Sequence, residues 1–171
     1  MQEITSSDKK LCWIHPDPAQ RYFELVADSE PVAKLQLQQG IVALAHAEAA
    51  EGRWTFKQVG FLHPHVTVRQ QGADVNVAKF EPNASGGGAL HFPDGRSFRW
   101  VSNFWLSEWS WTDVADNRVM SFRRDFAIDK REGELTLRLD AKEIPHLSIL
   151  ALLGWYLIIM LADEAAMTNL T

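Results

Sequence analysis

Residues 147–162 read LSILALLGWYLIIMLA, an apolar run of sixteen residues in a chain of 171 that is otherwise well supplied with polar and charged side chains. The run is too long and too uninterrupted for a β-strand. We therefore expect a helix that is entered after Pro145 and leaves through Asp163 and Glu164. The run is apolar on every side, and such a helix is surrounded either by protein or by lipid.

A membrane anchor fits the length and the flanks of this run poorly. Sixteen residues extend about 24 Å at the α-helical rise, whereas a hydrocarbon core of about 30 Å requires roughly twenty residues. No cluster of Lys or Arg adjoins either end, and acidic residues follow directly. We therefore predict a buried helix at about residues 146–163 and no transmembrane segment.

The residues before the helix alternate between apolar and polar with a period of two, which is typical of strands with one buried face. The clearest example is GELTLRLDA, in which Leu135, Leu137 and Leu139 fall on one face. In HVTVRQ, DVNVAKF and RYFELVA, the same rule assigns these inward residues: Val66 and Val68, Val75 and Val77, Phe23 and Leu25. This alternation is typical of antiparallel strands.

Turn signals separate the segments at short intervals and give about eleven or twelve candidate strands. The clearest turn is FPDGR at residues 92–96, because Pro presets one turn dihedral and Gly tolerates a positive φ at another. GIVALAHAEAAEGRW is ambiguous, since its alanines favour a helix. Val42, Leu44 and His46 alternate, however, so we predict a strand.

A closed barrel accounts for both the strands and the helix. A barrel of more than about eight strands leaves an interior that its own side chains do not fill, and a helix about 10–12 Å in diameter suits that space. We predict one mainly β domain over residues 1–171. In it, a closed antiparallel barrel of about twelve strands, at about residues 11–140, surrounds the buried C-terminal helix.

Composition limits the classes of function. The net charge of −5 disfavours a nucleic-acid binder, whose affinity rests on accumulated Lys and Arg. The one cysteine, Cys12, excludes an internal disulfide and fits a reducing compartment. The first residues contain no apolar run after their lysines, so no secretory signal is expected. We expect a cytoplasmic protein, with a peripheral position on a membrane as the second option.

Positive charge is concentrated in the middle of the chain. Residues 52–124 carry nine Lys and Arg and six Asp and Glu, whereas each flank carries four and eight. The alternation directs most of these cations outward. If strand pairing gathers them, they form a basic patch for an anionic phospholipid or an acidic protein partner; dispersal around the barrel is the default. The candidate anion-binding residues are Lys57, Arg69, Arg96, Arg99, Arg118, Arg123 and Arg124.

Aromatic residues are concentrated in RWVSNFWLSEWSW, which contains four tryptophans. We expect Trp109 and Trp111 to share the inward face and to belong to the core. Phe104, Trp105 and Leu106 fall in a hairpin loop, for which two interpretations remain open. The loop is either exposed beside three of the candidate arginines, as suits a membrane interface or a protein partner, or folded over a barrel end to cap the helix. The second interpretation is favoured.

No catalytic or cofactor-binding motif is found. His63 and His65 would direct their rings to one side of a strand, but spacing supplies no third metal ligand, so surface histidines are expected. NASGGGAL is followed neither by a Lys-Ser/Thr pair nor by a helix, as a nucleotide phosphate-binding loop would be. A mobile hairpin loop is therefore favoured. There is no G-x-S-x-G elbow, and Cys12 has no nearby activating partner. We expect neither an enzyme nor a bound cofactor or metal.

The order of elements resembles the tubby C-terminal-like superfamily, which includes tubby proteins, phospholipid scramblases and the plant LURP-one-related proteins. The resemblance rests on a succession of short hairpins from about Leu11 to Asp140, followed by LSILALLGWYLIIMLA and a very short tail. It covers nearly the whole chain. It implies a twelve-stranded barrel threaded by the terminal helix, and a role at membranes such as the binding of phosphoinositide head groups.

Two features of this sequence depart from that superfamily. Scramblases carry a cysteine cluster for lipidation and an acidic calcium-binding segment before the helix, whereas this chain has one cysteine and only Asp140 and Glu143 there. Calcium-driven lipid movement is therefore not expected. Two classes of function remain: a non-enzymatic membrane-surface or phospholipid-binding module, and a soluble protein-interaction or structural domain, which the net charge favours.

Overall fold

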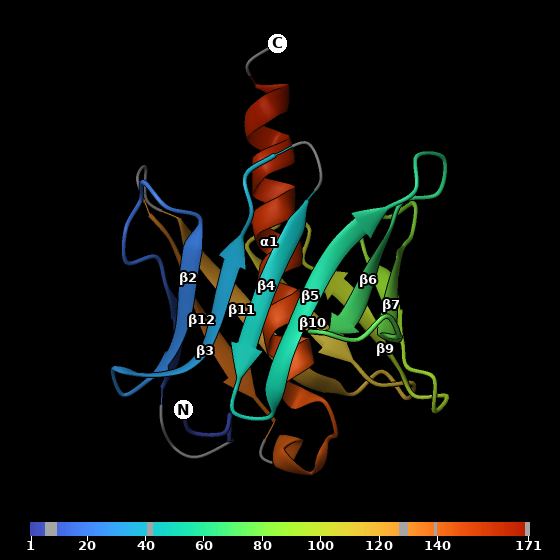
Figure 1. Ribbon diagram of the computed structural model, residues 1–171, viewed down its shortest axis with the longest axis horizontal. Coiled ribbons are helices and arrows are strands. Elements are labelled where there is room, and N and C mark those ends of the chain that lie inside the picture. Colours follow the sequence, from blue (N-terminus) through green and yellow to red (C-terminus); the bar gives the residue numbers. More distant parts are fainter. Residues whose placement is uncertain (6–9, 41–42, 127–129, 139, 170–171) are drawn as a thin grey trace.

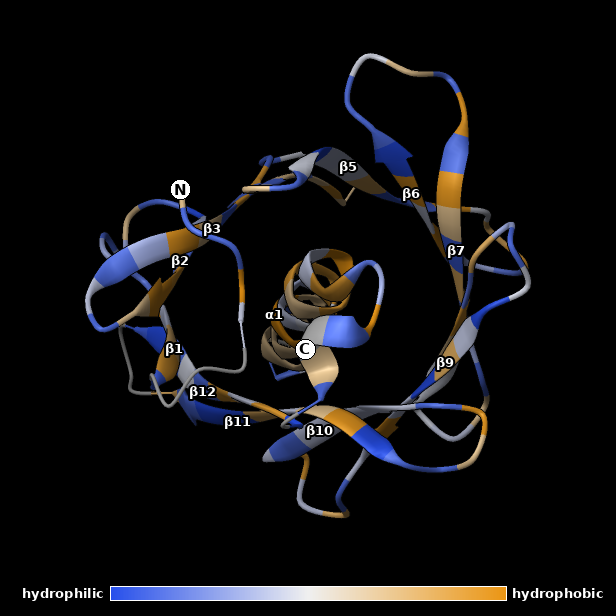
Figure 2. Ribbon diagram, turned by 90° about the horizontal axis from the view of Figure 1, so that it is seen from below, coloured by the Kyte–Doolittle hydropathy of each residue, from blue (hydrophilic) through white to orange (hydrophobic). Residues whose placement is uncertain are grey.

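The structure is a computed structural model that describes residues 1–5, 10–40, 43–126, 130–138 and 140–169. Within these residues, twelve antiparallel strands form a closed barrel, and one long helix runs through its centre (Figures 1 and 2). Each strand pairs with its neighbours in the chain, and β1 (Leu11–Ile14) pairs with β12 (Arg131–Leu137) to close the ring. The predicted fold class is confirmed.

The remaining strands follow one another around the barrel as a meander. They are β2 (Tyr22–Ala27), β3 (Glu30–Leu37), β4 (Leu44–Ala49), β5 (Gly52–Val59), β6 (His65–Gln70), β7 (Asn76–Pro82), β8 (Gly88–His91), β9 (Ser97–Ser102), β10 (Glu108–Thr112) and β11 (Arg118–Phe126). A short 3₁₀ helix, η1 (Ala141–Glu143), then leads to the central helix, α1 (Leu147–Thr168).

The central helix α1 is buried over most of its first thirteen residues and emerges from the barrel at its C-terminal end (Figure 1). It continues six residues beyond the apolar run, because DEAAMT is rich in strong helix formers. At 22 residues it extends about 33 Å, so length and composition alone would allow it to cross a membrane. The length argument against a membrane span was therefore wrong. Enclosure by the barrel explains why the helix is apolar on every side.

Two glycines allow aromatic rings to lie directly against the backbone of a neighbouring element. A Cβ atom added to Gly154 of α1 would lie 2.3 Å from the ring of Phe122 on β11. A Cβ atom added to Gly133 of β12 would lie 2.9 Å from the ring of Trp155. The Trp155 ring also stacks on that of Trp13, with 5.4 Å between centroids. These contacts fix how α1 is rotated within the barrel.

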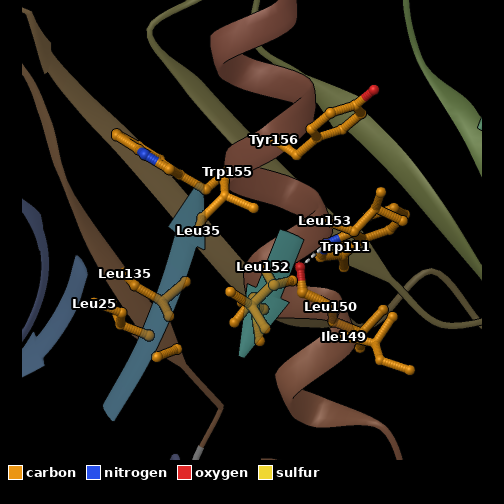
Figure 3. Close-up of a cluster of buried hydrophobic side chains, with 14 of the residues drawn as sticks. Leu25, Leu35, Trp111, Leu135, Ile149, Leu150, Leu152, Leu153, Trp155 and Tyr156 are labelled. Carbon is orange, nitrogen blue, oxygen red and sulfur yellow. Dashed lines mark hydrogen bonds between the residues drawn. The ribbon is translucent and has the colours of Figure 1, made fainter. Parts of the chain in front are cut away.

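Two polar contacts hold α1 at a defined depth. The Nε1–H group of Trp111 on β10 donates to the backbone oxygen of Leu150 at 2.8 Å (Figure 3). Closer to the exit, the hydroxyl of Tyr156 donates to the backbone oxygen of Ala43 at 2.9 Å. Both bonds satisfy polar groups of otherwise apolar side chains inside the barrel.

The strand β4 is correctly predicted, and alanines make its inner face. His46 is exposed and Leu44 is half-buried, while Val42 lies outside the described residues. The inward residues are Ala45, Ala47 and Ala49. Because α1 passes close to β3 and β4, small side chains are needed on the inner face. The alternation that predicted this strand therefore does not mark its inner face.

The inner face of β7 differs from the prediction. Val75 precedes β7 and is exposed, Val77 is half-buried and packs against the core, and the fully buried residues are Ala78 and Phe80. The pairing with β6 skips Val77, because Val68 faces Ala78 while Arg69 faces Asn76, and this register shift accompanies the change. The inward residues predicted for β2 and β6 are buried as expected: Phe23, Leu25, Val66 and Val68. On β12, Leu135 is buried and Leu137 half-buried, and Leu139 lies outside the described residues.

Candidate functional site

The end of the barrel from which α1 emerges carries every second connection of the meander (Figure 1). We call it the helix-exit end. The connections at this end that the structure describes in full are β1–β2, β5–β6, β7–β8 and β9–β10. The start of α1 lies at the opposite end, where Ser148 donates to the carboxylate of Glu51 in the β4–β5 connection at 2.6 Å.

Two connections at the helix-exit end present large apolar side chains to solvent. Phe61 and Leu62 of the β5–β6 connection are 96% and 81% exposed, and Phe104 and Trp105 of the β9–β10 connection are 89% and 78% exposed. Leu106 is also exposed. We call these five residues the apolar rim. Most proteins cover such residues, so their presence on one end of the barrel indicates a contact surface.

The β9–β10 connection is a tight turn built around the side chain of Asn103. Its Oδ1 atom accepts hydrogen bonds from the backbone N–H groups of Ser107 at 3.0 Å and Glu108 at 3.2 Å. Leu106 has a positive φ of 51° within this turn. The turn holds the rings of Phe104 and Trp105 edge to face, with 5.2 Å between centroids. The favoured interpretation, a loop that caps the helix, was wrong, because these rings face solvent.

Two cavities open at the helix-exit end between α1 and the barrel wall. The larger, about 780 Å³, lies between α1 and the side formed by β3, β4 and β5, and Met160, Asp163 and Met167 of α1 line it. The smaller, about 220 Å³, is bounded by α1 and by β5, β6, β7, β9 and β10. We call the smaller one the aromatic slot. It is lined by Val66, Phe80, Trp100, Trp109, Tyr156, Leu157, Met160 and Leu161, with Gln58, Pro82, Asn83, Gly86, Gly87 and Glu164.

A charged cluster ties the emerging helix to the wall of the barrel. Both oxygens of Asp163 on α1 accept hydrogen bonds, one from Arg21 of the β1–β2 connection at 2.5 Å and one from Arg131 of β12. Burial raises the pKa of Asp163, but the two arginines outweigh burial and hold the pKa below its ordinary value of 3.8. In the sequence, Asp163 is recognisable only as the residue that follows the apolar run. The one signal in the sequence for a structural role of Asp163 was that this acidic residue lies in helical register with buried positions.

Four of the seven candidate anion-binding residues are paired with carboxylates. The pairs are Arg96 with Asp94 at 3.6 Å, Arg99 with Asp116 at 2.5 Å, Arg118 with Glu108 at 3.7 Å and Arg123 with Glu134 at 2.6 Å. Arg96 belongs to the β8–β9 connection, and Arg99 pairs with Asp116 of the β10–β11 connection, so both lie toward the end opposite the rim. The expectation that Arg96, Arg99 and Arg118 lie beside the aromatic loop was therefore wrong for Arg96 and Arg99, whereas the Arg118 side chain reaches Glu108, which directly follows the rim turn.

Lys57 and Arg69 lie near each other on the outer wall. They occupy diagonal positions on β5 and β6, because Thr67 faces Lys57 and Thr55 faces Arg69. Arg69 donates to the side-chain oxygen of Asn76 at 2.8 Å. Together they form a small basic area on the wall of the barrel, not at its end.

Arg124 differs from the other candidates in facing the interior. It shares its face of β11 with the buried Phe122, and it is half-buried. Its guanidinium group lies over the rings of Trp109 and Phe126, at 5.7 and 5.3 Å from their centroids. Within the described part of the chain, no carboxylate pairs with it. Because its backbone N–H donates to Ser107 at 3.2 Å, Arg124 lies beside the rim turn.

Other residues considered from the sequence have simpler surroundings. His63 and His65 adjoin one another in and after the β5–β6 connection, and no group of three metal-ligating side chains occurs among the residues that the structure describes. Burial raises the pKa of the Cys12 thiol, so that it is protonated at neutral pH. Asn83 accepts hydrogen bonds from Ser85 and Gly87 and makes NASGGG a compact turn at the edge of the aromatic slot.

A scan against protein-family models and searches of curated proteins and of solved structures find no match. Function is therefore inferred from the geometry of the helix-exit end. That end combines exposed apolar residues, three of them in the hydrogen-bonded Asn103 turn, with cavities between α1 and the wall, and it suits the binding of an apolar surface or chain.

Proposed function

We propose that the protein is a non-enzymatic binding module that attaches peripherally to membranes through its helix-exit end. The observation that carries the proposal is the apolar rim, in which five large apolar residues from two connections are held in solvent at one end of the barrel. Aromatic and leucine side chains favour the interfacial region of a bilayer. Full burial of one such side chain is worth about 1.5–3 kcal/mol, so partial insertion of five supplies a useful affinity.

The rigidity of the rim supports a role in binding. The Asn103 turn fixes the backbone under Phe104 and Trp105 before any contact is made, so little conformational entropy is lost on binding. The architecture is also the one implied by the resemblance to the tubby-like superfamily, and membership in it is part of the proposal. The rim replaces the outer basic wall as the proposed contact, because most wall arginines have carboxylate partners.

A soluble protein-interaction domain is the second candidate. Two observations favour it: the net charge of −5, which an anionic membrane repels, and the suitability of exposed Trp and Phe side chains as anchors in a protein interface. In that case the same rim would contact a protein pocket, and an acidic partner would meet Lys57 and Arg69 on the wall.

Flotation with lipid vesicles distinguishes the two candidates. We expect the protein to float with phosphatidylcholine vesicles containing phosphatidylserine, and salt to weaken binding little, because the contact is mainly apolar. Replacing Phe104 and Trp105 with Ser should reduce the floated fraction at least tenfold. The matched control replaces the exposed Val75 and Val114 at the opposite end with Ser and should bind normally.

Failure of the unaltered protein to float with either neutral or anionic vesicles at low salt would contradict membrane attachment and favour the protein-interaction domain. Equal flotation of the Phe104 and Trp105 variant would show that the rim is not the contact.

A further inference from the structure

We infer that the aromatic slot admits part of one acyl chain of a membrane phospholipid while the helix-exit end rests on the bilayer. The inference rests on the proposed function and names the ligand chemistry of one cavity at that surface. The slot lies between α1 and the wall, and the aromatic rings of Phe80, Trp100, Trp109 and Tyr156 line it.

The lining of the slot favours a hydrocarbon chain over a polar ligand. Its deep walls are aromatic and aliphatic side chains, and the Tyr156 hydroxyl is already bonded to the backbone of Ala43. The ring of Trp111 packs against the lining residues Phe80 and Trp100, and its Nε1–H group is likewise bonded to Leu150. A polar ligand would lose its hydration without gaining hydrogen bonds from these walls, which is costly. A methylene chain has no hydrogen bonds to lose, and contacts with the walls replace the dispersion contacts it had with neighbouring lipid chains.

The size of the slot restricts what it can hold. Its volume of about 220 Å³ is below the range of about 300–1,000 Å³ that is usual for sites enclosing a whole small molecule. The slot therefore suits a segment of a single chain, with the rest of the molecule outside. Gln58, Asn83 and Glu164, which are polar, stand at its opening.

The position of the slot indicates that the acyl chain comes from a membrane. The slot opens at the helix-exit end, and Trp109, one of its walls, is the second residue of β10, the strand that follows the rim turn directly. When the rim is inserted, the opening faces the bilayer and a chain can enter without crossing water. The guanidinium group of Arg124 over the Trp109 ring is suitably placed to meet the phosphate of the same lipid.

Quenching of tryptophan fluorescence by phosphatidylcholine brominated in its acyl chains tests the inference. The test starts from Trp105→Phe, which keeps an aromatic ring in the rim but removes its exposed tryptophan. Vesicle binding of this variant should quench fluorescence through Trp100 and Trp109 in the slot. Leu161→Phe, added to it, fills the slot and should at least halve the quenching while flotation is unchanged. Val101→Phe adds the same ring to the outer wall and serves as the control.

The outcomes separate the slot from the rim. Normal flotation without quenching, or quenching that Leu161→Phe leaves unchanged, overturns the inference and leaves the proposed function standing. If the protein does not float, the proposed function fails. Quenching by a brominated fatty acid in solution would then assign the slot to free fatty acids and overturn the membrane as the source. Thermal unfolding of each variant confirms that it is folded.

Discussion

Gly154 controls how closely α1 can approach β11. Gly154→Ala raises helix propensity by about 1 kcal/mol, yet its methyl group would lie 2.3 Å from the end of the Phe122 ring, far inside contact distance. Overpacking typically costs about 1–3 kcal/mol, so we expect a net loss of stability in urea unfolding. Phe122→Leu should restore part of the loss in the double variant. Equal or greater stability of Gly154→Ala alone would show that the ring can move aside.

Asp163 stabilises the emerging helix only while its carboxyl group is ionised. Its folded pKa lies below the ordinary 3.8, so its contribution is complete above that value and is lost as the pH falls through the folded pKa. We expect Asp163→Asn to lower the free energy of unfolding by about 1–3 kcal/mol at pH 7, and the difference from the unaltered protein to shrink below pH 4.

Urea unfolding at pH 7 and pH 3 measures this difference, with Glu164→Gln as the exposed control on the adjacent position. A difference between the unaltered protein and Asp163→Asn that is the same at both pH values would contradict the ionic role of the cluster formed by Arg21, Asp163 and Arg131.

The helix α1 is the core around which the strands close, and a charge in its middle should prevent folding. Leu153 is completely buried, and an unpaired carboxylate there costs several kcal/mol out of the roughly 5–15 kcal/mol that stabilise a typical domain. We expect Leu153→Asp to be insoluble or to lack the near-ultraviolet signal of packed tryptophans. Met167→Asp, on the exposed end of the same helix, should fold normally. A folded Leu153→Asp protein would mean that α1 is not an essential part of the core.

The elements that could be predicted from the sequence are those whose residue pattern depends on burial alone. The apolar run predicted α1, because a helix without a polar face needs all-round cover, and alternation predicted most strands. The inner faces of β4 and β7 were not predicted, for local reasons. Alanines face α1 on β4 because the helix passes close by, and the pairing of β7 with β6 contains a register shift at Val77. A period of two shows neither how closely a neighbouring helix approaches a strand nor where a strand contains a bulge.

The site is built from residues that are close in space but far apart in the sequence, so their spacing in the sequence does not predict it. Arg21 and Asp163 are 142 positions apart and hydrogen-bonded. Phe61 and Trp105 come from separate hairpins, and they share an end of the barrel only because every second connection of a meander lies there. Among the predicted basic residues, Arg124 alone combines an inward face with a position beside the rim turn. Its alternation with Phe122 was the signal that could have identified it.

Hydrogen–deuterium exchange with and without anionic vesicles tests most directly whether the helix-exit end is the contact surface. We predict slower exchange in the β5–β6 and β9–β10 connections when vesicles are present, and unchanged exchange in the β6–β7 and β10–β11 connections at the opposite end. Protection confined to the wall around Lys57 and Arg69, or to the opposite end, would contradict the account.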